Sequence, residues 1–159
     1  MAKVPEKVIF DEPEVKTGFL GRKYFLPPKK VSHFSNLQFK EEYKAVRAHV
    51  IVNPYSGKKK GSKIANLVKD ELTNSKINVE IYETEKPEHA IHIVKTLSLD
   101  EGDTILTIGG DGTFCEVISG FMDRSDDSVR NIPLGLIPAG TGNSQANDME
   151  IIDYRDAVE

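Results

Sequence analysis

Three short loops, rich in glycine and small polar residues, hold the groups that could carry chemistry. They read Asn53-Pro54-Tyr55-Ser56-Gly57, Gly109-Gly110-Asp111-Gly112-Thr113 and Gly140-Thr141-Gly142-Asn143. Glycine lets the backbone come close to a ligand, and backbone N–H groups with Ser and Thr hydroxyls can hold an anion such as phosphate. The first and third loops, each taken alone, are also compatible with plain turns, because Asn, Pro, Ser and Gly form turns in many proteins.

The second loop carries the strongest signal, since three glycines surround one carboxylate. It is predicted to precede a helix, whose N-terminus is the positive end of the helix dipole. A carboxylate among phosphates is repulsive without a cation, so Asp111 indicates either Mg²⁺, held directly or through water, or a base that takes a proton from an incoming hydroxyl. The alternative is that Asp111 caps the following helix. We also expect Gly110 or Gly112 to have a positive φ or to contact phosphate with bare backbone.

Familiar motifs with related chemistry fail on spacing. The stretch from Gly57 to Lys63 lacks the residue order of a P-loop. Cys115 stands where a dinucleotide-binding fingerprint needs its third glycine. The four histidines show no zinc-binding pattern. With apolar helical neighbours, Cys115 is predicted to be a buried filler, and Lys58–Lys60 a solvated run beside the proposed phosphate site.

Alternating strands and helices must position these loops. Apolar runs predict strands at residues 49–52, 77–81, 104–108 and 134–137, with amphipathic helices between them. The first helix should bury one face, made of Ile64, Leu67, Val68 and Leu72. This β-α-β-α-β-α-β order predicts an α/β fold, a mainly parallel sheet with helices on both faces. In such sheets ligands bind outside the carboxyl ends of the strands, where all three loops are expected to lie.

The chain divides into two zones. Residues 1–47 are charged and interrupted by proline and glycine, so we predict a partly ordered N-terminal extension. Its apolar stretches Val8-Ile9-Phe10 and Tyr24-Phe25-Leu26 could be strands. Residues 48–159 are predicted to form the domain that carries the three loops.

Composition narrows the class of protein. The formal net charge of −4 and the pI near 5.6 do not favour a general nucleic-acid binder. A single cysteine and the lack of a signal peptide at Met1–Phe10 predict a cytoplasmic location. No apolar run approaches the ~20 residues that span a bilayer, so membrane contact is expected to be peripheral. The oligomeric state is left open.

The combination of loops resembles the catalytic domain of diacylglycerol kinases and their sphingosine and ceramide kinase relatives. It consists of Asn53-Pro54-x-Ser56-Gly57, the run from Gly109 to Thr113 with Glu116-Val117, and Pro138-Ala139-Gly140-Thr141-Gly142-Asn143. Thr84-Glu85 with His89-Ala90 is similar to the sphingosine and ceramide kinase branch. The resemblance implies a NAD kinase/diacylglycerol kinase-like fold. It also implies an enzyme that transfers the γ-phosphoryl group of Mg-ATP to the hydroxyl of a lipid.

The resemblance also implies roles for individual residues. Thr84, Glu116 and the first loop would line the nucleotide, Gly109, Gly110, Gly112 and Thr113 would cradle phosphate, and the third loop would complete the site. Asp111 matches the carboxylate that sphingosine kinases are thought to use as general base, although bacterial relatives place a base in a second domain. That β-rich, lipid-holding domain is expected to be absent from these 159 residues. The alternatives are a non-catalytic nucleotide-binding module and, further off, an NAD kinase.

Overall fold

The computed structural model describes residues 15–17, 23–25, 43–126 and 132–158. The chain forms two units, Met1–Glu42 and Tyr43–Glu159. In the first unit, β1 (Val15–Thr17) pairs antiparallel with β2 (Lys23–Phe25). The strand predicted at Tyr24-Phe25-Leu26 is therefore confirmed over Tyr24 and Phe25, while Val8-Ile9-Phe10 lies outside the described residues.

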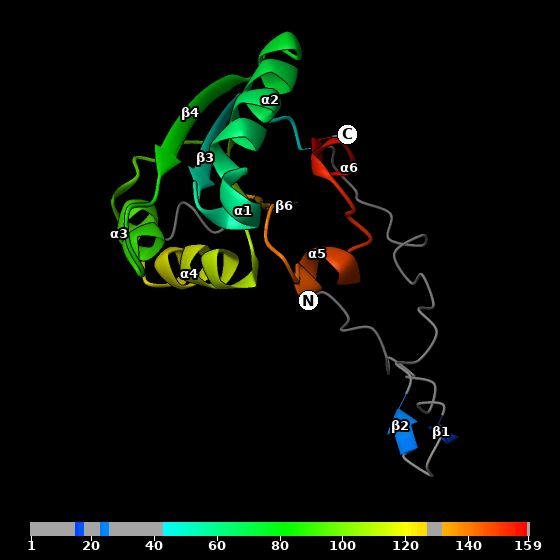
Figure 1. The fold of residues 1–159 in the computed structure, drawn as a ribbon. Coiled ribbons are helices and arrows are strands. Elements are labelled where there is room, and N and C mark those ends of the chain that lie inside the picture. The colour runs from blue at the N-terminus through cyan, green and yellow to red at the C-terminus, as the bar shows by residue number, and fades with distance from the viewer. Residues whose placement is uncertain (1–14, 18–22, 26–42, 127–131, 159) are drawn as a thin grey trace, which may run out of the picture. The chain divides into compact units, whose positions relative to one another are not determined.

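A parallel four-stranded sheet forms the centre of the second unit (Figure 1). Its strands are β3 (Arg47–Val52), β4 (Asn78–Glu83), β5 (Asp103–Gly109) and β6 (Leu134–Pro138). Their order across the sheet is β4-β3-β5-β6, and every neighbouring pair is parallel. The predicted α/β class and all four predicted strands are confirmed.

The helices follow the predicted alternation, with additions. They are α1 (Ser56–Lys59), α2 (Gly61–Asn74), α3 (His89–Thr96), α4 (Asp111–Met122), α5 (Ser144–Asp148) and α6 (Tyr154–Val158). The short α1 occupies a stretch predicted to be loop, and α5 and α6 follow the last predicted element. No helix of the described residues is long and apolar enough to cross a membrane.

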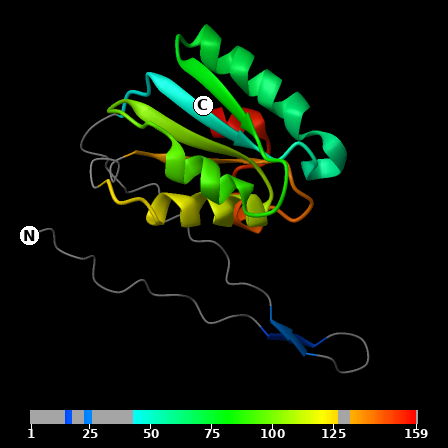
Figure 2. The ribbon, with the colours of Figure 1, turned by 90° about the vertical axis from the view of Figure 1, so that its left-hand side faces the viewer.

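Strands β3, β5 and β6 are largely buried on both faces of the sheet, which explains their mainly apolar sequences, while β4 lies at the sheet edge and is partly exposed. Successive side chains of a strand point to opposite faces. On β3, Val50 and Val52 pack with Val68 of α2 and with α6, while Ile51 packs with Val94 of α3 and with α4. Figure 2 shows the strands between α2 on one side and α3 and α4 on the other. The helices thus cover both faces, as predicted.

Two side chains predicted to be buried are exposed. On α2 the buried positions are Ala65, Val68 and Leu72, and Leu67, which lies beside this stripe, is 37% exposed. On α4, Phe114 faces the core, so the next residue, Cys115, points outward and is exposed. Neighbours on a helix point about 100° apart, and Leu67 and Cys115 lie outside the buried stripes of their helices.

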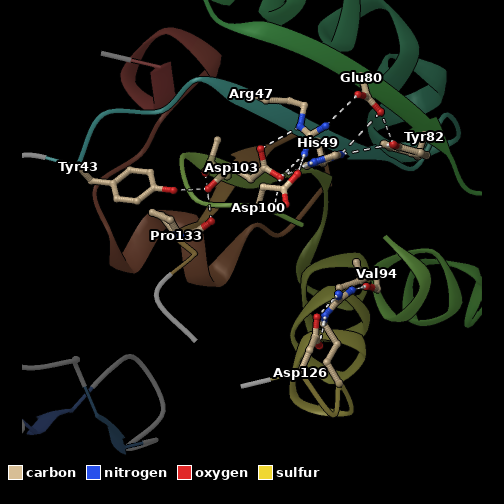
Figure 3. A network of polar contacts seen from close by, with 12 residues as sticks. Tyr43, Arg47, His49, Glu80, Tyr82, Val94, Asp100, Asp103, Asp126 and Pro133 are labelled. Atoms are coloured by element: carbon tan, nitrogen blue, oxygen red, sulfur yellow. Dashed lines mark hydrogen bonds and ion pairs between the residues drawn. The ribbon is translucent and has the colours of Figure 1, made fainter. Parts of the chain in front are cut away.

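A network of polar side chains joins the amino ends of β3 and β5 (Figure 3). Arg47 donates from Nε to Asp103 Oδ1 at 2.9 Å and from Nη2 to Asp103 Oδ2 at 2.7 Å. His49 Nε2 lies 3.2 Å from Asp103 Oδ2, and the Tyr43 hydroxyl donates to the Asp103 carbonyl. Burial alone would raise the pKa of Asp103. The bonds from Arg47, from the Asp100 N–H and from His49 outweigh burial and lower that pKa to about 2.

The network extends to β4 through Tyr82. Its hydroxyl donates to Glu80 Oε2 at 2.6 Å and lies 3.4 Å from His49 Nδ1. Burial, and then the hydrogen bond to Glu80, raise the pKa of Tyr82 to about 12. The side chains at this end of the sheet therefore satisfy one another, and the network has a structural character.

Candidate functional site

The carboxyl ends of the four strands bring the chemistry-bearing loops together. The chain adds β4 on one side of β3 and then returns to add β5 on the other, so the order reverses between β3 and β5. In open parallel sheets such a switch point opens a crevice for a ligand. Here the loops that follow β3 and β5 meet directly, because Asn53 donates from Nδ2 to Thr113 Oγ1 at 3.4 Å.

The first loop has an unusual backbone. Asn53 shapes its start by accepting from the Tyr55 N–H at 3.0 Å through Oδ1 and from the Ser56 N–H at 3.1 Å through its carbonyl. The three residues Gly57–Lys59 then adopt left-handed conformations, with φ between 57° and 67°. Left-handed backbone costs a non-glycine residue roughly 1–2 kcal/mol. Backbone strain of this kind clusters at functional sites, such as active sites and ligand-binding loops.

Two glycines let the loops pack backbone against backbone. A Cβ on Gly57 would lie 2.2 Å from the Ala139 carbonyl oxygen, and a Cβ on Gly140 would lie 2.6 Å from Gly110 Cα. Ala139 and Gly140, where β6 leads into the third loop, therefore touch the first loop and the second loop. A larger side chain at either glycine would force the loops apart.

The second loop departs from one expectation. Gly110 has φ −98° and ψ −175°, which is extended backbone, and Gly112 lies inside α4. Neither glycine therefore has the positive φ that was one of the two expected alternatives, because the strand runs straight into the helix, and the other alternative, contact with phosphate, stays a prediction. Apart from its own helical turn, no atom of the described residues lies within 4 Å of an ideal Cβ on Gly112, so the space beside it is open.

The loops surround a cleft of about 570 Å³. This lies within the range of small-molecule sites, about 300–1,000 Å³. The predicted site residues that line it are Asn53, Tyr55, Ser56, Gly57, Thr84, Gly110, Gly112, Thr113, Glu116, Gly140 and Thr141. The predicted site residues that do not line it are Pro54, Gly109, Asp111, Gly142 and Asn143.

Four lining residues were not predicted as part of the site: Lys58, Glu85, Lys86 and Pro87. Lys58 was interpreted as one of a solvated run, yet its left-handed backbone places it at the cleft. The other three directly follow Thr84 at the carboxyl end of β4. Their position after a strand of a parallel sheet was the signal that could have found them.

The cleft carries both signs of charge. Lys58 and Lys86 contribute cations, while Glu85 and Glu116 contribute carboxylates. Glu116 is also tied to α3, because its Oε2 accepts from the Ala90 N–H at 3.3 Å. Among the residues that the structure describes, no cluster of three or more His, Cys, Asp or Glu side chains could hold a metal ion by itself.

Asn143 and Asp111 support the loops from outside the cleft. Asn143, at φ 50°, closes the third loop by accepting from the Gly140 N–H at 2.8 Å and donating to the Gly140 carbonyl at 2.9 Å. Asp111 accepts from the Ser144 N–H at 3.0 Å and the Gln145 N–H at 3.1 Å. These two backbone bonds lower the pKa of Asp111.

Comparison with known proteins gives a consistent result. The family model of the diacylglycerol kinase catalytic domain matches residues 47–159. Sphingosine kinase B of Dictyostelium discoideum is 37% identical over 113 residues, which are 70% of this chain and 15% of that protein. Sphingoid long chain base kinase 5 of Saccharomyces cerevisiae is 37% identical over 114 residues, which are 67% of this chain and 17% of that protein. The chain thus spans under a fifth of the length of these two relatives.

A solved structure has the same fold. A diacylglycerol kinase from Bacillus anthracis aligns with a TM-score of 0.60 at 23% sequence identity, over 74% of this chain and 39% of the other. At this level of identity the likeness speaks for the fold alone. It agrees with the parallel sheet and the two helical layers described above.

Proposed function

The chain belongs to the diacylglycerol kinase catalytic domain family, and from that premise we propose that it is the nucleotide-binding part of an ATP-dependent lipid kinase. The observation that carries the proposal is the cleft at the switch point, with all three glycine-containing loops in its wall. The reaction would transfer the γ-phosphoryl group of ATP to a lipid hydroxyl.

We propose that the phosphates lie between the first loop and the start of α4. Lys58 brings a positive charge to this end of the cleft, and Ser56 and Thr113 bring hydroxyls. Gly110, which precedes α4, has no side chain to cap the helix, so its first N–H groups are available to an anion. The open space beside Gly112 allows a phosphate to approach the backbone.

The sugar and base would lie toward Thr84 and Glu85. Carboxylates repel phosphate but accept hydrogen bonds from hydroxyl and amino groups, so these side chains suit the uncharged end of a nucleotide. Thr84 is buried behind this end of the cleft, where its N–H donates to the Val52 carbonyl at 2.8 Å.

The residues present are compatible with Mg²⁺ that arrives with the nucleotide. Magnesium in kinases is held by one or two carboxylates together with substrate phosphates, and Glu116, one turn after Thr113 on α4, is the carboxylate of the cleft that suits this role. When bound, Mg²⁺ neutralises phosphate charge. The chain itself would contribute positioning and hydrogen bonds, which supply most of the catalysis in phosphoryl transfer.

Binding of nucleotide is the first test. Isothermal titration of the chain with ADP and with ATP, each with and without Mg²⁺, should give saturable binding at one site. Gly140→Val should abolish it by separating the second and third loops, while Lys69→Ala, an exposed change on α2, should leave it intact. Wild-type protein that binds neither nucleotide would contradict the proposal.

Phosphoryl transfer is the second test. A radiolabelled ATP assay would start with sphingosine, because the two relatives compared above are named for sphingoid bases, and continue with diacylglycerol and ceramide. We expect robust transfer only from a longer form that includes a lipid-holding domain, because an unpositioned acceptor forfeits about 7–11 kcal/mol of the barrier reduction. Efficient transfer by residues 1–159 alone would show that no such domain is needed.

A further inference from the structure

We propose that Asp111 is a positioning residue, a latch that holds the third loop against the start of α4 so that this loop forms one wall of the cleft. The proposal rests on the proposed nucleotide function for its consequence, but its geometry stands independently. The two carboxylate oxygens each accept one backbone N–H across the gap between the loops. Oδ2 accepts from Ser144 at 3.0 Å and Oδ1 from Gln145 at 3.1 Å.

The direction of the side chain supports this role. Gly110 and Gly112, the neighbours of Asp111 on either side, line the cleft, and Asp111 does not. The carboxylate points instead to the backbone that follows the third loop, where an ideal Cβ on Gly142 would lie 3.8 Å from Oδ2.

The third loop is attached to the second loop at its start, where the Gly140 N–H donates to the Gly109 carbonyl at 3.2 Å, and a latch would attach its far end. Asn143 closes the loop on itself through Gly140, which sets its shape but does not attach it to α4. The close approach of Gly140 to Gly110 is a contact without side chains. Behind the loop, Ala146 packs with Phe114. Asp111 supplies the charge-assisted bonds that join the two segments, and such bonds are about twice as strong as neutral ones.

A latch and a catalytic carboxylate predict opposite changes in nucleotide binding without Mg²⁺. A base or a magnesium ligand has no favourable contact with metal-free ADP. Its removal would leave the affinity unchanged or raise it, because one negative charge near the phosphates is lost. Removal of a latch frees Thr141, which lines the cleft, to move and therefore weakens the binding of metal-free ADP.

The test is titration of metal-free ADP, with EDTA present, into the wild type, Asp111→Ala, Asp111→Asn and the control Asp70→Asn, an exposed change on α2. We expect affinity about tenfold lower in Asp111→Ala, the order of effect for charge-assisted bonds. Asp111→Asn, which keeps one acceptor oxygen in place, should fall between Asp111→Ala and the wild type. Affinity that is unchanged or higher in Asp111→Ala would overturn the latch.

Amide hydrogen exchange supplies a readout that does not need nucleotide. The Ser144 and Gln145 amides should exchange at least about tenfold faster in Asp111→Ala than in the wild type, while the amides of β5 keep their rates. If the wild type binds no ADP, the nucleotide function fails and the exchange rates alone decide the latch. Unchanged exchange at both amides would overturn it, and if Asp111→Ala does not fold, Asp111→Asn provides the same comparison.

Discussion

The two ends of the sheet use polar residues in opposite ways. At the amino ends of the strands, the Arg47, His49 and Asp103 side chains bond to one another, and the Asp103 carboxylate is almost fully buried (Figure 3). At the carboxyl ends, backbone and small side chains surround an open cleft. The same strands thus carry a closed polar network at one end and an accessible site at the other.

This difference separates stability from binding. Breaking a polar network that satisfies itself lowers the free energy of unfolding, because a buried group loses its partner, and such a network offers little to a ligand. A cleft with strained backbone and open space contributes little to stability and much to recognition. Changes at the amino end should therefore lower stability without altering nucleotide affinity. Changes at the carboxyl end should lower nucleotide affinity with little loss of stability.

The largest effect is expected from Arg47→Met at the amino end. It leaves the buried Asp103 carboxylate without its cation, and breaking a buried pair from one side costs about 3 kcal/mol. Urea unfolding should show this loss, while ADP affinity measured on the folded protein stays at the wild-type value. The matched control is Lys95→Met, which breaks the exposed pair with Asp123 and should change stability by less than about 0.5 kcal/mol. Equal losses in the two variants would show that the network adds no special stability.

Acid should weaken the same end. The pKa of Asp103 is lowered in the folded protein, so its contribution is fully present above the ordinary value of 3.8 and is lost as the pH falls toward about 2. That difference corresponds to about 2 kcal/mol of unfolding free energy. Unfolding curves measured from about pH 5 to about pH 2 cover both pKa values of Asp103. They should show the loss of unfolding free energy in the wild type and a flatter pH profile in Asp103→Asn. Parallel profiles would rule out Asp103 as the source.

At the carboxyl end, Gly112→Ala should weaken ADP binding about tenfold, or about 1.4 kcal/mol, because a methyl group enters the space where phosphate is proposed to lie. Stability should stay the same or rise by up to about 1 kcal/mol, since Ala favours helix over Gly. Gly120→Ala in the same helix is the control with the opposite signature. Its Cβ would lie 2.6 Å from the Ile91 carbonyl oxygen, so it should lower stability and leave the affinity unchanged. Unchanged affinity in Gly112→Ala would place the phosphates elsewhere.

The smallest effect concerns the strain in the first loop. Lys59 has φ 67°, so Lys59→Gly should raise the free energy of unfolding by about 0.5–1 kcal/mol by relieving left-handed strain. Lys60, with φ −94°, is the neighbouring control, and Lys60→Gly should lower stability instead. Thermal unfolding resolves shifts of this size. Destabilisation in both variants would mean that Lys59 carries no strain.

The strands and the main helices could be predicted because their signals are local. Buried parallel strands are continuous apolar runs, such as the one from Thr104 to Ile108, and helices repeat their apolar residues every three to four positions. The carboxyl-end location of the loops then followed from topology alone. Thr84 lies at the cleft for the same reason, because it directly follows the carboxyl end of β4.

The remainder depended on contacts between distant residues. In the sequence, Lys58 and Lys59 look like ordinary surface lysines. The left-handed turn becomes evident only from the packing of Gly57 against Ala139. The hydrogen bonds that Asp111 accepts come from amides 33 and 34 residues further along the chain. The sequence suggested that Asp111 could cap its own helix. A hydrogen bond to a segment far along the chain leaves no local sequence signal, so this bond could not be predicted. The pairing of Arg47 with Asp103 was likewise missed, since charged residues at strand ends are common.

The most direct test of the central claim is to map ADP binding on the folded chain by NMR. Each backbone amide would be followed during titration of the wild type with ADP. The account predicts saturable shifts at the amides of Gly57, Gly112 and Thr141, with those of Arg47, His49 and Asp103 unmoved. The absence of saturable shifts, or shifts that centre on the amino-end network, would contradict it.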